Sequence, residues 1–338
     1  MDLSRSGLHR SSPSIVNFWS RKKVVVTGGT GFIGSHCVER LLELGATVRA
    51  VGRSGGSERR FLSHRLGEFE YLPADLENPD GTREALTGQD IVIHLAAYVA
   101  GVEYNSAHPG TMFSRNLAVG LPTLTAAAEL GLERTVVVSS ACVYARHCSI
   151  PTPEHEGFLG DPEPTNFGYG WAKRALEVHA RGLHEEFGAP VSIPRLYNGY
   201  GPRDNFDRAT SHVIPALIRR ASEATDHLTI WGDGLQTRSF LYVTDFVEGI
   251  LKVAECSADA EAVNIGTDEE ISIAELARLI INQVNPDLEI RHDLSKPSGQ
   301  PRRGGDLRKA RALGFSAAVP IQEGIARTVA WYKENPPA

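Results

Sequence analysis

Short apolar runs alternate with longer amphipathic segments through the first 140 residues of the chain. Helical spacing of apolar residues follows the first run as far as Leu44 and returns over residues 116–130. Strands that alternate with helices predict an α/β fold with a parallel, doubly wound sheet. The runs expected to form its strands are residues 22–27, 47–51, 68–74, 91–96 and 135–139.

A glycine-rich turn joins the first expected strand to the first expected helix. Gly28, Gly31 and Gly34 have G-x-x-G-x-x-G spacing, and Phe32 and Ile33 lie between the last two. Glycines allow the backbone to turn tightly and to approach a pyrophosphate, whose charge the helix N-terminus favours. The order of strand, turn and helix therefore predicts that these five residues bind a dinucleotide.

The end of the second strand bears on the choice of dinucleotide. A carboxylate about 20 residues beyond the glycines usually holds the adenosine ribose of NAD, whereas this chain has Gly52-Arg53-Ser54 there. Arg53 suits a 2'-phosphate and favours NADP over NAD, although a solvated loop arginine would look the same. Asp75 and Leu76 follow the third run and are expected at the adenine edge, unless Asp75 only caps a helix.

Tyr169 and Lys173 are four residues apart in a helical segment, so their side chains share one face. The ammonium is expected to favour the ionised phenol, whose free pKa is about 10, and so to let it exchange a proton with a substrate hydroxyl. Ser140 follows the run at 135–139, where ligands gather in such folds. It is expected either to bind the same substrate oxygen or only to cap a turn.

These motifs resemble, in their order and spacing, the extended short-chain dehydrogenase/reductase family, the NAD-dependent epimerases and dehydratases of nucleotide sugars. The resemblance runs from about residue 22 to about residue 333. It implies a Rossmann-type domain at 21–195 and a smaller α/β substrate-binding domain formed mainly by 196–338. The chain is expected to cross back around 238–266, and two copies are expected to form a homodimer.

Finer motifs are similar to two branches of this family. Residues 231–240 look like the GDP-mannose 3,5-epimerases, as do residues 140–144. The other branch is the GDP-L-fucose synthases, and both branches epimerise C3 and C5 beside a C4 ketone. Ala141-Cys142 stands where the sugar 4,6-dehydratases carry an Asp-Glu pair, so water elimination is not expected. The segments that resemble the GDP-L-fucose synthases are 140–144, 198–202, 204–206, 211–220 and 295–302.

In the fucose synthases, the positions that match Cys142 and His212 invert the two carbons. A C4 ketone acidifies the neighbouring hydrogens, and inversion needs one group to remove a proton and another to deliver one to the opposite face. Free thiol and imidazole groups, with pKa values near 8.5 and 6.5, can do both near neutrality. An inert buried cysteine and a helix-capping histidine are the alternatives.

The diphosphate of a nucleotide sugar requires cations from the C-terminal half. Arg238 follows a glycine-containing turn and can make bidentate contacts with phosphate. The resemblance adds Arg220 and Lys296 as further cations and implies that Asn198 contacts the sugar. Each cation could instead be an ordinary surface charge.

Composition limits the partners. A formal charge of −6 and a pI of 6.1 give no general attraction to nucleic acid or to anionic membranes. The 4 cysteines form no metal-binding pattern and fit reduced thiols in a cytoplasmic protein. No apolar run approaches the roughly 18 residues of a membrane span. Residues 1–20 lack the core of a secretion signal and are expected to form a flexible tail.

The function expected from these features is epimerisation beside a C4 ketone, followed by reduction of that ketone by NADPH. The substrate would be a hexose carried by a nucleoside diphosphate, with GDP favoured. Alternatives within the family are a redox-neutral 3,5-epimerase, which resembles the GDP-mannose enzymes, and a 4-epimerase that needs only Ser140, Tyr169 and Lys173. An alternative of another class is a non-catalytic NAD(P)-binding sensor or scaffold.

Overall fold

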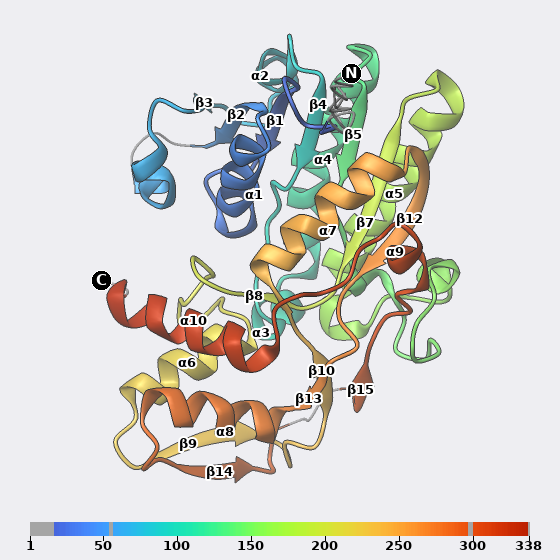
Figure 1. The fold of residues 1–338 in the computed structure, drawn as a ribbon. Coiled ribbons are helices and arrows are strands. Elements are labelled where there is room, and N and C mark those ends of the chain that lie inside the picture. The colour runs from blue at the N-terminus through green and yellow to red at the C-terminus, as the bar shows by residue number, and fades with distance from the viewer. Residues whose placement is uncertain (1–16, 54–56, 297–299, 337–338) are drawn as a thin grey trace, which may run out of the picture.

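An eight-stranded parallel sheet forms the centre of the larger part of the molecule (Figure 1). This computed structural model describes residues 17–53, 57–296 and 300–336. The spatial order is β12-β7-β5-β4-β1-β2-β3, and the short β6 pairs with β7. The strands are β1 (Lys23–Thr27), β2 (Thr47–Gly52), β3 (Glu70–Pro73), β4 (Ile91–His94), β5 (Arg134–Val137), β6 (Ser139–Ser140), β7 (Val191–Leu196) and β12 (Asp259–Ile265).

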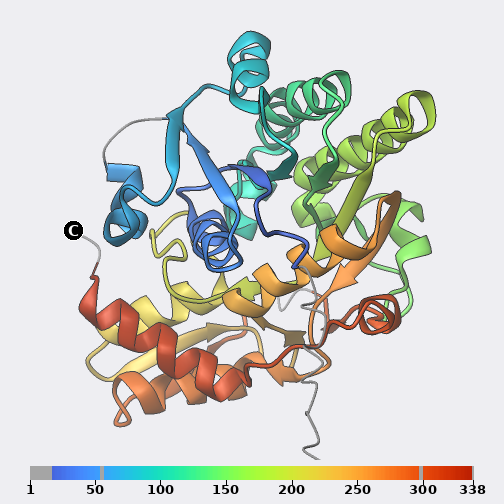
Figure 2. The same cartoon turned by 45° about the horizontal axis from the view of Figure 1, so that its top comes forward.

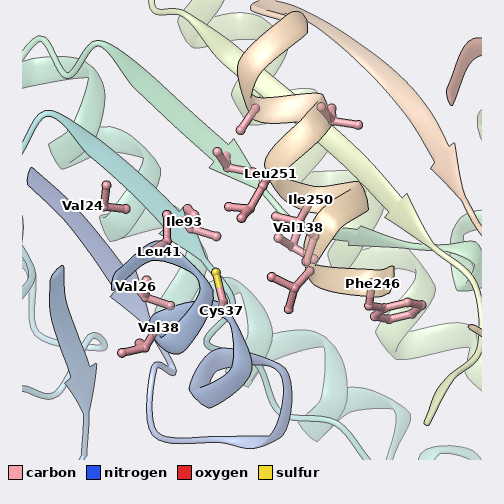
Figure 3. Close-up of a cluster of buried hydrophobic side chains, with 14 of the residues drawn as sticks. Val24, Val26, Cys37, Val38, Leu41, Ile93, Val138, Phe246, Ile250 and Leu251 are labelled. Carbon is pink, nitrogen blue, oxygen red and sulfur yellow. The ribbon is translucent and has the colours of Figure 1, made fainter. Parts of the chain in front are cut away.

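Helices cover both faces of this sheet because alternate strand residues point to opposite sides. Val24 and Val26 pack with α1 and α7 on one face, as Figure 3 shows. Val25 packs with α2 and α4 on the other face, and α5 lies beside α4. The expected doubly wound α/β fold is therefore confirmed. The helices around the sheet are α1 (Phe32–Glu43), α2 (Pro79–Leu86), α3 (Val102–Ala107), α4 (Pro109–Glu129), α5 (Phe167–Phe187), α7 (Val243–Cys256) and α9 (Arg308–Ala312).

A smaller α/β unit lies beyond one end of the large sheet, in yellow, orange and red in Figures 1 and 2. Its apolar core contains Leu217, Ile230 and Ile280 from three different elements, and Ile325 closes it. The chain returns from this unit to the large sheet through α7 and β12. The elements of the smaller unit are α6 (Val213–Glu223), α8 (Ile273–Val284), α10 (Ile321–Glu334), β9 (His227–Trp231), β14 (Glu289–Asp293), β10 (Thr237–Ser239), β13 (Glu270–Ser272) and β15 (Arg302–Arg303).

Two local features differ from the expected elements. The strand expected at 135–139 is divided at Val138 into β5 and β6, and the Val138 carbonyl accepts a hydrogen bond from Lys173 Nζ at 2.9 Å. The last residues of the segment expected to form a tail at 1–20 are ordered instead: Trp19 is fully buried in the core of the large unit, and its Nε1 donates to Glu255 Oε1 at 2.7 Å. Residues 1–16 lie outside the described part of the chain.

The two units are joined by polar contacts between α1 and the loop after β8 (Gly199–Tyr200). Arg203 donates from both terminal nitrogens to the carboxylate of Glu39, each at 2.9 Å. One nitrogen of the His36 ring lies 3.0 Å from the Pro202 carbonyl oxygen. These contacts tie the helix that begins at the glycine-rich turn to the loop that leads into α6. Within the described residues, no helix is long and apolar enough to cross a membrane.

Candidate active site

The large sheet and the smaller unit enclose a cavity of about 1400 Å³. Its walls include the carboxyl ends of β1, β4 and β6, where side chains from separate strands converge. Of the residues expected in the site, Lys296 alone does not line this cavity; it lies with its Nζ 5.4 Å from the ring centre of Trp231, which does. The others that line it are Gly28, Gly31, Phe32, Ile33, Gly34, Arg53, Asp75, Leu76, Ser140, Cys142, Tyr169, Lys173, Asn198, His212, Arg220 and Arg238.

The glycine-rich turn forms one end of the cavity. Gly28 has a φ of +68°, a conformation that glycine adopts without the strain of a side chain. A Cβ atom on Gly34 would lie only 2.0 Å from the Gly28 carbonyl oxygen, so α1 can begin this close to β1 only with glycine there. Gly31 caps α1, whose N-terminal amides carry the positive end of the helix dipole. This cradle of backbone amides fits the pyrophosphate of a dinucleotide.

Arg53 and Tyr98 lie where the adenosine of such a dinucleotide would bind. Arg53 Nη1 donates to the Tyr98 hydroxyl at 2.9 Å, and the Arg53 and Arg115 guanidiniums lie 5.2 and 4.9 Å from the centre of the Tyr98 ring. Arg53 lines the cavity and can offer a cation to a 2'-phosphate, whereas Arg115 is not part of the lining. The Tyr98 hydroxyl also donates to Glu77 Oε1 at 3.2 Å. Asp75 lines the cavity and also accepts a hydrogen bond from the Glu77 amide at 3.0 Å, so it braces its own turn as well.

Ser140, Tyr169 and Lys173 come together from β6 and α5. Lys173 is buried and its Nζ lies 5.6 Å from the centre of the Tyr169 ring. Burial lowers the pKa of Lys173 to about 8. Burial also raises the pKa of Tyr169, the nearby Cys142 thiol raises it further, and hydrogen bonding to Ser140 acts in the opposite direction.

The hydrogen bond that Lys173 Nζ donates goes to the Val138 carbonyl at 2.9 Å. Burial of the phenol, the largest effect on Tyr169, raises its pKa. Tyr169 consequently keeps its proton at neutral pH. In this state it is a proton donor that faces the cavity.

Cys142 and His212 face the same cavity from different units. Cys142 lies in the short turn Ala141–Val143, and its amide donates to Ser140 Oγ at 3.2 Å. His212 is the N-cap residue of α6, but its side chain makes no capping hydrogen bond. His212 is exposed by its accessible surface and lines the cavity, whose walls desolvate the imidazole and lower its pKa. A neutral imidazole can act as a base.

Two arginines lie side by side in the part of the cavity that the smaller unit forms. Arg238 on β10 and Arg303 on β15 are register partners on neighbouring strands. Burial and the Arg303 charge lower the pKa of Arg238 to about 10, which marks a crowded cationic site suited to an anion. Asn198 donates from Nδ2 to the Ser239 carbonyl at 2.9 Å, and Arg220 donates to the Thr229 carbonyl.

Sequence reasoning missed Arg303 and Asp204. Arg303 follows Arg302, which pairs with Glu270 at the surface. Because neighbouring residues of a strand point to opposite sides, Arg303 lines the cavity, and this alternation is the only sequence signal that separates the two arginines. Asp204 lines the cavity, and its buried Oδ2 has no partner among the described residues. Burial raises the pKa of Asp204 to about 7. No three His, Cys, Asp or Glu residues of the described chain are arranged to hold a metal ion.

Comparisons with known proteins agree on one family. Residues 24–266 match the model of the NAD dependent epimerase/dehydratase family. A probable GDP-L-fucose synthase 1 of Oryza sativa subsp. japonica is 32% identical over 93% of this chain and 92% of its own length. GDP-mannose 3,5-epimerase 1 of the same plant is 30% identical over 94% of this chain and 84% of its own.

A solved structure has the same fold over almost its whole length. UDP-glucose 4-epimerase from Thermotoga maritima, determined with UDP-glucose, superposes with a TM-score of 0.82 at 27% identity. The match covers 92% of this chain and 99% of that one.

Proposed function

This chain belongs to the NAD dependent epimerase/dehydratase family and is an NAD(P)-dependent enzyme of nucleotide-sugar chemistry, and we propose that it inverts C3 and C5 of a 4-keto sugar before reducing C4 with NADPH. The expected family, fold and catalytic class are thereby confirmed. The proposed substrate is a 4-keto-6-deoxyhexose attached to GDP, the nucleotide named in the two relatives described above, whereas two relatives of similar identity are named as dTDP-4-dehydro-6-deoxy-D-allose reductases.

The observation that carries this proposal is that Cys142 and His212 line the cavity that also holds Ser140 and Tyr169. A 4-epimerase has no need of the thiol and imidazole. For inversion at C3 and C5, one of these two groups removes the acidified proton and the other returns a proton to the opposite face. The lowered pKa of His212 keeps it neutral and able to accept the first proton.

Reduction at C4 uses the residues on β6 and α5. Ser140 and Tyr169 bind the C4 oxygen, and the phenol of Tyr169 donates its proton as that oxygen becomes a hydroxyl. The ammonium of Lys173 offsets the negative charge that then develops on the phenol. When bound, NADPH supplies the hydride that C4 receives. Arg53 supports NADP over NAD because it lines the cavity and offers a cation for a 2'-phosphate.

The diphosphate of the substrate would bind Arg238 and Arg303. Their adjacency across two paired strands presents two guanidiniums to one anion, which a single surface arginine does not do. Arg220 and Asn198 lie on the same wall, with Lys296 near its rim beside Trp231.

The decisive experiment incubates the purified protein with NADPH and GDP-4-keto-6-deoxymannose. We expect stoichiometric loss of nicotinamide absorbance and, in deuterated water, incorporation of deuterium at C3 and C5. Isomerisation without cofactor oxidation would contradict the reductase half of the proposal.

A redox-neutral 3,5-epimerase is the second candidate, because residues 231–240 and a curated relative both point to it. That enzyme would convert GDP-mannose with a cofactor that is reduced and reoxidised in each turnover. It would also incorporate deuterium at C3 and C5. A 4-epimerase returns the same hydride to C4 and would incorporate none. A non-catalytic sensor would bind NADPH yet turn over no nucleotide sugar.

A further inference from the structure

One face of α5 contacts three consecutive residues, 138–140, which follow β5 and include β6. Tyr169, Lys173 and Glu177 follow one another at four-residue intervals and therefore lie on one side of the helix. Tyr169 contacts Ser140, and Lys173 Nζ donates to the Val138 carbonyl at 2.9 Å. Ser139 Oγ donates to Glu177 Oε1 at 2.5 Å. The reaction mechanism uses the first two residues of this helix face and leaves Glu177 without a role.

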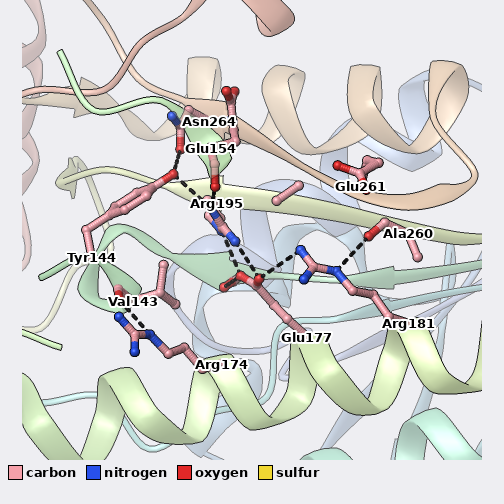
Figure 4. Close-up of polar contacts among 12 residues, drawn as sticks. Val143, Tyr144, Glu154, Arg174, Glu177, Arg181, Arg195, Ala260, Glu261 and Asn264 are labelled. Atoms are coloured by element: carbon pink, nitrogen blue, oxygen red, sulfur yellow. Dashed lines mark hydrogen bonds and ion pairs between the residues drawn. The ribbon is translucent and has the colours of Figure 1, made fainter. Parts of the chain in front are cut away.

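Glu177 is held by a fully buried arginine (Figure 4). Arg195 Nε donates to Glu177 Oε1 at 2.8 Å, and Arg195 Nη2 donates to Oε2 at 2.7 Å. Arg195 is also the register partner of Ser139 in the β6–β7 pair. The Glu177 carboxylate thus bridges two neighbouring strands. It accepts one hydrogen bond from the Ser139 hydroxyl on β6 and others from the Arg195 guanidinium on β7.

The surroundings of Arg195 leave it little freedom. Its Nη1 donates to the Tyr144 hydroxyl at 3.0 Å and to the Glu154 carbonyl at 2.6 Å. A Cβ atom on Gly157 would lie 2.3 Å from Nη1, so the loop above it also fits the guanidinium closely. The Tyr144 hydroxyl in turn donates to Asn264 Oδ1 at 2.5 Å.

We propose that Glu177 is a positioning residue for the reaction at C4, which fixes the strand segment 138–140 against α5 and thereby sets the approach of Ser140 to Tyr169. This inference rests on the proposed function of the same site. Arg195 aims the carboxylate of Glu177 through two hydrogen bonds. A buried ion pair contributes little net stability over apolar side chains of similar size, so its presence here is better accounted for by placement than by stability.

The charge of Glu177 also reaches Lys173. The groups that face Lys173 are Tyr169 on its own helix, Cys142, His94 on β4, and Glu177. Burial lowers the pKa of His94 to about 3, so that ring is neutral. Cys142 and Glu177 both raise the pKa of Lys173 against the larger effect of its burial.

The test uses two variants and a control. Ser139→Ala removes the contact to Glu177 and leaves the ion pair in place. The double variant Glu177→Met/Arg195→Met replaces the pair by apolar side chains of similar length and should still fold. Arg181→Met is the control, because Arg181 Nη2 lies 3.8 Å from Glu177 Oε2 and takes no part in the contact with Ser139.

We expect kcat to fall about tenfold or more in both variants, with KM and NADPH affinity changed less than about twofold, because misplacement near reacting atoms acts on the chemical step. The alkaline limb of the pH profile should move to lower pH in the double variant and stay in place in Ser139→Ala. Hydrogen exchange of residues 138–142 should become faster in Ser139→Ala. Arg181→Met should match the wild type in all of these.

Wild-type kcat and wild-type exchange in Ser139→Ala would overturn the inference, as would a folded double variant with unchanged kcat and pH profile. A wild-type protein that turns over no 4-keto sugar nucleotide contradicts the proposed function instead. In that case the exchange measurement still decides whether Glu177 holds segment 138–140.

Discussion

Burial shifts the pKa values of three side chains that face the cavity: Tyr169, Lys173 and His212. It raises the pKa of Tyr169, lowers that of Lys173 to about 8 and lowers that of His212. At neutral pH the phenol therefore carries its proton, the lysine is still cationic, and the imidazole is a free base. These are the states that proton removal at carbon and proton delivery to the C4 oxygen require.

The alkaline limb of activity should belong to Lys173. Its pKa of about 8 lies below the usual value, whereas Tyr169 keeps its proton to higher pH. We expect kcat/KM to be constant about one pH unit or more below pH 8, to be halved near pH 8, and to fall about tenfold per pH unit well above it, because the ammonium is lost. A pH series of NADPH oxidation measures this. Lys173→Arg should keep its charge and lack that limb, and an unchanged limb would assign it to another group.

Substitution of Cys142 or His212 should impair epimerisation and leave reduction at C4 in place. Cys142→Ala or His212→Gln removes a group that exchanges protons at carbon, so deuterium incorporation at C3 and C5 should drop by about 100-fold or more. Reduction of the C4 ketone without inversion should persist, because Tyr169 and Lys173 are untouched. Mass spectrometry and NMR of the product measure both events. Equal loss of incorporation and reduction would show that the two residues act at C4 instead.

Asp204 should make stability depend on pH. Its pKa is raised from 3.8 to about 7, so between these values the folded state binds more protons than the unfolded state. The free energy of unfolding should therefore fall as pH rises from about 4 to about 7. In Asp204→Asn, the side-chain oxygen can still accept the Asn205 amide, a contact of 2.7 Å in the native protein.

Thermal unfolding of Asp204→Asn should therefore vary less with pH over this range. Its Tm should exceed the wild-type Tm at pH 8 and match it near pH 4, where both side chains are neutral. A variant that is less stable at pH 8 would mean that the ionised carboxylate has an unseen partner.

At the scale of elements, close approach between helices and strands shapes the site. Gly34 lets α1 begin against the Gly28 carbonyl, and Gly170 lets α5 lie against the turn that holds Cys142. A Cβ atom on Gly170 would be 2.4 Å from the Cys142 carbonyl oxygen. Both glycines lie in helices, where glycine costs about 1 kcal/mol relative to alanine. The close contacts explain why alanine is absent from these positions.

Gly34→Ala should damage the cofactor site selectively. The new methyl group would meet backbone atoms of Gly28 and Gly29 at 2.0 to 2.8 Å, so the turn must move away from α1. We expect NADPH affinity to fall at least about 100-fold, or ~2.7 kcal/mol. Fluorescence titration measures the affinity. Gly110→Ala is the matched control in α4, since nothing lies within 4 Å of its added Cβ.

At the scale of the whole molecule, the two packed helices α4 and α5 each carry exposed apolar side chains. Phe113 and Leu121 lie on α4, and Phe167 and Val178 lie on α5, which packs against it. We call these four residues the α4–α5 stripe. Apolar surface shared by adjacent helices is typical of an interface between subunits. We therefore propose that this face forms the homodimer expected from the family.

Sedimentation should give twice the mass of one chain, and Val178→Glu should give a monomer. Val178 is 57% exposed, so the substitution spares the fold while it places a charge in the interface. Leu294→Glu is the control, since Leu294 is 75% exposed and lies on the smaller unit. A wild-type monomer, or a dimer that withstands Val178→Glu, would contradict this interface.

Local spacing in the sequence determined the sheet, the glycine-rich turn and the helix face of Tyr169 and Lys173, because these depend on residues close together in the chain. It also indicated Cys142 and His212, through similarity of short motifs. Lys296 was expected among the residues that bind substrate, and it lies beside the cavity wall at Trp231. Trp19 was expected in a tail, but in the structure its side chain is fully buried in the core.

Tertiary structure alone decided which groups are desolvated and which distant residues meet. Desolvation depends on every element around a side chain, so the raised pKa of Tyr169 had no signal in its own segment. Arg303 joins Arg238 only because β15 pairs with β10, and Glu177 meets Arg195 only because α5 lies across β7. Spacing along the sequence cannot show which charged residues meet when they are far apart in the chain. Here such meetings form both the proposed anion site at Arg238 and Arg303 and the contact of Glu177 with Arg195 beneath Ser140.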